Sequence, residues 1–457
     1  CIASLIFYAF PAYIRLLSYI LEFVAILMGV SSKYSKTWAA GSYFDLILSS
    51  AMMMLLFIAT ITIIFFTDST TLFATEELTN ITTFALVFCA SIGWIMAIHA
   101  GIAFDILPLI HGVVTFEYTL LRHYLLVNVA GQALILAGLL TGDVQLMQDF
   151  STAGIALLSW SLVMLGDPGK NLHQNKKSRS DDEVGIASSL PGLLLPLFGI
   201  ASFTTWVLRD IPGMIELGFA IILVIFLNMI NFATILSHFN RRVNMAIIKP
   251  KHIPMIFITL LSLSTLHAVM AFLYGRGNVS NDMFSISLGL PFLWIFVMSK
   301  PFKLLRNSIS KNSTPHSKLI LASLFSYPLL VATTAFNRFG IDLGNGVTYA
   351  LFIFCTSLLC VWGMALYLHE DHLHKSTHTR KTPWLTLLST IAGAMLIIII
   401  YIGIDVENDG FSEIEILWAM TILISFIAWA IVMVKDVFLG EKDWHKIPMY
   451  YDRFIEK

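Results

Sequence analysis

The chain consists largely of windows of about 20 apolar residues, each bounded by polar residues or by Gly and Pro. Backbone polar groups inside lipid are satisfied only in a helix or a closed barrel, and the alternation typical of barrel strands is absent. The pattern therefore predicts an all-α, polytopic transmembrane helix bundle. We expect about thirteen helices, at 4–29, 44–67, 82–108, 119–141, 150–166, 188–208, 213–238, 254–275, 283–299, 318–337, 346–368, 384–404 and 413–435.

The connections between these windows carry very unequal positive charge. Of the 28 Lys and Arg residues, 24 fall in the connections after odd-numbered windows, at the window ends that border these connections, or in the carboxyl-terminal tail. Three follow even-numbered windows, and Arg15 lies inside the first window. Cytoplasmic connections are enriched in Lys and Arg, so the split predicts an outer amino terminus and a cytoplasmic carboxyl terminus in a cell or inner membrane. Cys1 fits either a processed, lipidated terminus or the end of a fragment.

The expected domain organisation follows from the longest inner connection. Residues 1–166 form transmembrane helices 1–5, 167–187 a cytoplasmic linker of mixed charge, 188–436 helices 6–13, and 437–457 a cytoplasmic tail. The three internal cysteines lie in apolar windows and are interpreted as packing residues. The chain contains no P-loop, Gly-x-Ser-x-Gly, Cys-x-x-Cys-His or HExxH motif, which argues against soluble-type nucleotide or protease chemistry. No nucleic-acid partner is expected.

One apolar window, Trp94 to His111, contains a histidine and a carboxylate, His99 and Asp105. An ionisable group in hydrocarbon costs several kcal/mol unless it is paired or lines a cavity, so such groups indicate a functional site. Asp105, together with Glu22 in the first window, is a candidate for a transport path.

Two histidines lie inside apolar windows, His99 in the third and His267 in the eighth. A neutral imidazole in a bundle can ligate haem iron or copper through one nitrogen. The alternative for each is a hydrogen bond to a neighbouring backbone group or hydroxyl. Their expected depths differ, since His99 lies toward the inner end of its helix and His267 toward the outer end of its own.

A second histidine cluster follows the eleventh window: His369, His372, His374 and His378. On a helix these residues form i,i+3 and i,i+4 pairs, which is the spacing of zinc or copper ligands. The alternative is a solvated interfacial segment.

The histidines His99, His238 and His369 fall near the inner ends of windows 3, 7 and 11, and each precedes a proline: Pro108, Pro250 and Pro383. This spacing suggests a unit of four helices used three times. In this architecture the chain resembles the haem-copper oxidase superfamily, including its nitric-oxide-related members. The resemblance implies bound haem b and copper; the superfamily's adjacent histidine pair and His-x-x-x-Tyr motif are not found in this chain.

Amide side chains form two further pairs, each one helical turn apart: Asn128 with Gln132, and Asn228 with Asn231. Such pairs bridge helices or line a path.

The sequence favours a haem- or copper-associated subunit of a respiratory or nitrogen-oxide-related electron-transfer complex. The alternatives are a secondary transporter of a cation or small solute, and a non-catalytic scaffold subunit. Its expected partners are the lipid bilayer and other membrane subunits.

Overall fold

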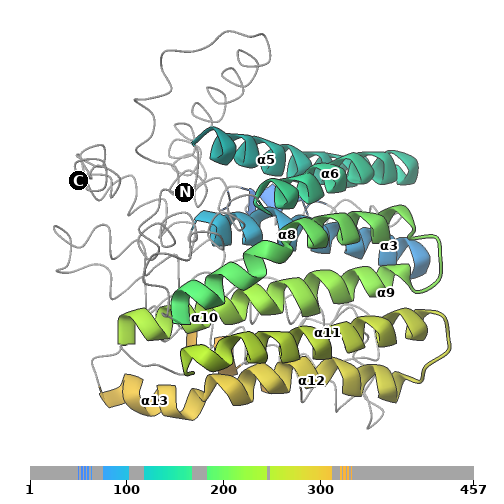
Figure 1. Ribbon diagram of the computed structural model, residues 1–457. Helices are drawn as coiled ribbons and strands as arrows, with labels where there is room; N and C mark the ends of the chain where they lie inside the picture. The colour runs from blue at the N-terminus through green and yellow to red at the C-terminus, as the bar shows by residue number, and fades with distance from the viewer. Residues whose placement is uncertain are drawn as a thin grey trace, which may run out of the picture.

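The computed structural model describes residues 76–101, 118–166, 183–243 and 248–310, with isolated helical residues between 50 and 63 and between 320 and 331. This part of the chain is all-helical (Figure 1). Its helices are α3 (Glu76–Phe88), η3 (Cys89–Ile95), α5 (Tyr118–Leu140), α6 (Val144–Met164), α8 (Glu183–Val207), α9 (Met214–Phe219), η4 (Ala220–Leu227), α10 (Asn228–Val243), η5 (Pro250–His252), α11 (Ile253–Gly275), α12 (Asn281–Ser299) and α13 (Pro301–Ser310).

Several elements join end to end into two longer helices, which we call rods. The first rod begins with α3 and η3 and continues through residue 101. The second rod consists of α9, η4 and α10 and runs without interruption. The described residues of seven expected transmembrane windows, the third to the ninth, therefore lie mainly in helices. The total of thirteen and the four-helix repeat extend outside the described residues and stay predictions.

Five helices of the described part are long and apolar enough to cross a bilayer, which agrees with an integral membrane protein. They are Asn80–Gly101, His123–Leu140, Met214–Leu236, Ile253–Gly275 and Asn281–Ser299. The apolar part of α8, Gly192–Val207, is shorter. The α6 helix, which covers most of the fifth window, is not among the five.

The helices run antiparallel in chain order, with short turns at one end of the bundle joining α5 to α6, α8 to α9, and α11 to α12 (Figure 1). Each of these three turns contains a glycine with positive φ: Gly142 at 67°, Gly213 at 91° and Gly277 at 72°. Glycine adopts this conformation without the steric cost that a Cβ atom brings. Asp143 then caps α6, because its side chain accepts a hydrogen bond from the Leu146 N–H at 2.9 Å.

Glycines also set the spacing between neighbouring helices. A Cβ atom on Gly131 of α5 would lie 2.8 Å from the Gly154 carbonyl oxygen of α6, and one on Gly199 of α8 would lie 2.5 Å from the Ser159 carbonyl oxygen of α6. Small residues of this kind let helix backbones approach closely in membranes, where no hydrophobic force drives helices together. Helices α5, α6 and α8 therefore form a tightly packed group.

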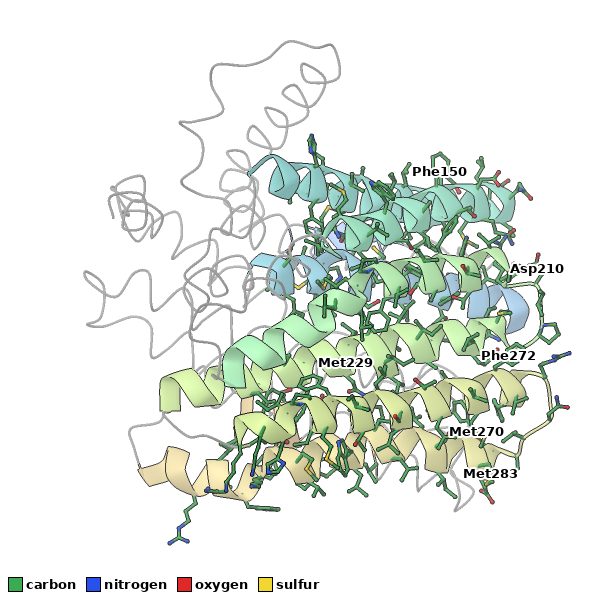
Figure 2. All side chains as sticks on the ribbon, in the orientation of Figure 1. Phe150, Asp210, Met229, Met270, Phe272 and Met283 are labelled. Carbon is green, nitrogen blue, oxygen red and sulfur yellow. The ribbon has the colours of Figure 1, made fainter. Side chains whose placement is uncertain are left out.

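Most carboxylates and most positive charges of the described part lie at opposite ends of the bundle, although Arg209 and Arg276 lie at the end with the carboxylates. We call the end with the short turns the acidic end; its carboxylates include Asp143, Asp149, Asp210, Glu216 and Asp282. The opposite end, the basic end, carries Lys249, Lys251, Lys300, Lys303 and Arg306. Figure 2 shows Asp210, Phe272 and Met283 toward the acidic end and Met229 near the middle of the bundle's length.

Helices α11 and α12 expose apolar side chains along their length: Met255, Ile258, Leu266, Val269, Met283, Ile286, Leu293 and Val297. In a bilayer such a face contacts lipid chains. The two central helices are different, because most residues of Asn80–Gly101 and Met214–Leu236 are buried. Polar side chains on these two rods are therefore shielded from lipid by the helices around them.

Candidate functional site

The two buried rods share an unusual feature at mid-length. Each changes from an α-helix to a wider π-helical segment, η3 in the first rod and η4 in the second, and the two segments pack against each other. π-Helical turns are rare and are found mostly at functional sites. Buried polar side chains gather beside both segments, and we take this region as the candidate site.

Gly93 interrupts the first rod. Its backbone angles, φ −73° and ψ −105°, are not helical. A Cβ atom at this position would lie 2.7 Å from the Gln132 side chain of α5, so only glycine lets that amide approach the backbone so closely.

The α5 amides attach to the backbone at this break. The Asn128 Nδ2 donates to the carbonyl oxygens of Ile92 at 3.1 Å and Gly93 at 3.4 Å. The Gln132 Nε2 in turn donates to the Asn128 Oδ1 at 2.6 Å. Asn128 thus bridges α5 and the first rod, which is one of the two roles expected of the amide pairs. Both amides are about 1% exposed, and the Gln132 Oε1 has no hydrogen-bond partner among the described residues.

The second rod contributes its own amides immediately after η4. Asn228 donates to the Val224 carbonyl oxygen at 2.9 Å, a bond within its own helix, and its Oδ1 finds no hydrogen-bond partner in the described part of the chain. Asn231, one turn further on, is likewise fully buried. Met229, which lies between them in sequence, is near the middle of the bundle in Figure 2, so these amides lie at mid-depth.

His99 is buried between the two rods, with 4% of its surface exposed. Its Nδ1 lies 3.4 Å from the Thr234 Oγ1 of α10, at the long end of the hydrogen-bonding range. Its Nε2 has no hydrogen-bond partner within the described ranges. A buried polar atom left in this state costs about 1–3 kcal/mol, so His99 is a position at which a ligand atom would be stabilising.

His267 belongs to a different contact. Its Nδ1 lies 3.0 Å from the Ser287 Oγ of α12, and that hydroxyl donates to the Phe284 carbonyl oxygen at 2.7 Å. Since the hydroxyl proton is used in this bond, Ser287 accepts from the imidazole. The observed contacts of His267 are thus with α12 and those of His99 with α10.

The remaining predicted site residues lie outside the described residues: Glu22, Asp105, His369, His372, His374 and His378. Among the residues that the structure describes, no group of three or more His, Cys, Asp or Glu side chains is arranged to hold a metal ion. The metal and transport-path assignments of these six positions therefore stay predictions.

Gly93 is the site residue that the sequence interpretation missed. A glycine within a helical, apolar window costs helix stability, and this was the available signal. Its role becomes visible only when α5 is in place, because Gln132 lies 39 residues further along the chain.

Comparisons of the chain with protein-family models, with curated proteins and with solved structures give no match. The interpretation of the site therefore depends on its own chemistry.

Proposed function

We propose that this protein is a membrane carrier that moves a small polar solute or a cation between its two buried rods. The observation that carries the proposal is the break at Gly93, where non-helical backbone meets the Asn128 and Gln132 amides at about 1% exposure. Non-helical backbone inside a membrane is tolerated where protein buries it or where it lines a cavity, and broken helices form the binding sites of many transporters.

The chemistry of the site suits reversible binding. Amide groups offer hydrogen bonds without a full charge, so a solute can enter and leave without a buried ion being left behind. The wider π-helical segments on both rods place this polar surface where the rods contact each other. A small displacement between the rods would then open the site to one end of the bundle.

The test is flux into proteoliposomes that contain the purified full chain. The panel comprises labelled sodium, rubidium, methylammonium and urea, each compared with empty liposomes. We expect uptake of at least one solute, and loss of most of that uptake in Gly93→Ala, whose methyl group would displace Gln132.

The control is Gly277→Asn, a glycine substitution in an acidic-end turn with nothing within 4 Å of the added atom. Asparagine tolerates the positive φ there. Absence of flux for every solute of the panel would contradict the carrier proposal. Full flux in a Gly93→Ala variant whose Gln132 side chain keeps its position would contradict it as well.

A haem- or copper-associated electron-transfer subunit is the second candidate, and the partnerless Nε2 of buried His99 is the observation that favours it. A haem ligated by intramembrane imidazoles gives an intense Soret band that shifts on reduction. The test is a reduced-minus-oxidised spectrum of the cofactor-replete protein, repeated on His99→Ala and His267→Ala. A signal lost in one variant identifies a ligand, whereas a featureless spectrum removes the haem interpretation.

A further inference from the structure

The buried amides near the Gly93 break leave acceptors, rather than donors, without partners. The Asn128 Nδ2 is held by backbone carbonyl oxygens, so its Oδ1 must face Gln132. Gln132 must then turn its Nε2 toward that oxygen at 2.6 Å. The chain of bonds fixes both amide orientations and leaves the Gln132 Oε1 as a buried acceptor.

On the second rod, the Asn228 side chain also has a bonded amide nitrogen and an amide oxygen without a partner in the described part of the chain. Its Nδ2 is taken by the Val224 carbonyl oxygen at 2.9 Å, which leaves the Oδ1 buried and, among the described residues, unpaired. Asn228 is 0% exposed and Gln132 is 1% exposed. Water does not reach these oxygens, so a ligand that complements them must bring a positive charge or hydrogen-bond donors.

The charges along the five spans limit that ligand further. Their described carboxylates are Glu216 and Asp282, each in the first turn of its helix at the acidic end. Magnesium and calcium sites normally include carboxylates, which offset the double charge. Neutral oxygens alone are sufficient for a monovalent ion, as in filters where carbonyl oxygens replace its hydration shell.

We propose that the Gln132 amide oxygen beside the Gly93 break binds a monovalent cation, either an alkali metal ion or an ammonium group. The buried Asn228 Oδ1 gives the second rod the same preference for a positively charged ligand. The inference rests on the proposed carrier function for the ion's passage, and it names the class of ion carried.

The experiment measures the thermal midpoint of the purified full chain in detergent. Lithium, sodium, potassium, ammonium and methylammonium chlorides are each compared with N-methylglucamine chloride at equal ionic strength. Because a ligand that binds only the folded state stabilises it, we expect at least one cation to raise the midpoint by about 2 °C or more. The pattern across the panel distinguishes a metal ion from an ammonium group.

Two variants assign the effect to Gln132. Gln132→Leu should abolish the cation-dependent rise, and Gln132→Glu should lower the half-saturating cation concentration by ~10-fold because it adds a negative oxygen. The matched control is Gln145→Leu, an exposed glutamine of α6 at the acidic end, which should respond as the unmodified chain does.

Equal midpoints in all salts, or a rise that survives in Gln132→Leu, would overturn the inference. If Gln132→Leu does not fold, an unchanged half-saturation in Gln132→Glu would overturn it instead. Cation binding without flux in proteoliposomes would remove the carrier proposal and leave the cation site. Flux of urea with no cation effect would leave a carrier and remove the cation site.

Discussion

At the scale of single residues, a hydroxyl on α6 holds the largest buried side chain of α8. The Trp206 indole N–H donates to the Thr152 Oγ1 at 2.9 Å, and the same hydroxyl donates to the Gln148 carbonyl oxygen at 2.7 Å. The Arg209 guanidinium lies 4.9 Å from the centre of the Trp206 ring and donates to the Gln148 Oε1 at 3.2 Å. These contacts connect α6 and α8 near the acidic end.

Thr152→Val tests this connection. Valine keeps the volume of threonine but leaves the buried indole N–H without its acceptor, so we expect a loss of about 1–3 kcal/mol in stability. The measurement is the thermal midpoint in detergent. The control is Thr204→Val, an exposed threonine that bonds only to the Ile200 carbonyl of its own helix. Equal midpoints for the two variants would show that the indole bond contributes nothing.

At the scale of elements, the close approach of α5 and α6 depends on a pair of facing glycines. A Cβ atom on Gly154 would lie 2.5 Å from the Gly131 carbonyl oxygen and 2.7 Å from the Ile135 side chain. Gly131 is one residue from Gln132. The Gly131–Gly154 contact therefore also fixes the position along the bundle axis at which the α5 amide side chains lie beside Gly93.

We therefore expect Gly154→Val to push α5 away from α6, with a stability cost of about 1–3 kcal/mol from overpacking. It should also weaken whatever flux the intact carrier shows, because Gln132 moves with α5. The control is Ala153→Val, the adjacent residue, whose side chain is exposed. A Gly154→Val variant with an unchanged thermal midpoint would contradict the role assigned to this contact.

At the scale of the whole molecule, the charge separation predicts how the bundle sits in a membrane. The basic end corresponds to the connections that the sequence places in the cytoplasm, and the acidic end to those placed outside. The described helices alternate in direction as this topology requires.

Labelling with an impermeant maleimide tests this orientation. In a background in which Cys1, Cys355 and Cys360 are serine, we expect outside reagent to label Asp210→Cys and positions in 405–415, but neither Lys303→Cys nor positions in 170–183. Cys89 is fully buried and serves as the unreactive internal control. Labelling at both ends, or the reverse pattern, would refute the predicted topology.

Several properties of this protein were determined by the sequence alone. Windows of about 20 apolar residues specify helices because lipid offers the backbone no hydrogen bonds, and the described residues of the third to ninth windows are indeed mainly helical. Burial of Cys89, of His99 and His267, and of the amide pairs followed from their position inside these windows. These are local properties, and local pattern was sufficient to predict them.

Tertiary structure decided which buried polar residues meet. The break at Gly93, the Asn128 bonds to carbonyl oxygens about 36 residues away in the chain, and the separate partners of His99 and His267 depend on which helices pack together. In lipid, that choice is made by small-residue contacts and side-chain hydrogen bonds between distant segments, because apolar surface is equally satisfied by lipid chains. Such contacts have no periodic signature along the chain, so they became visible only in the folded bundle.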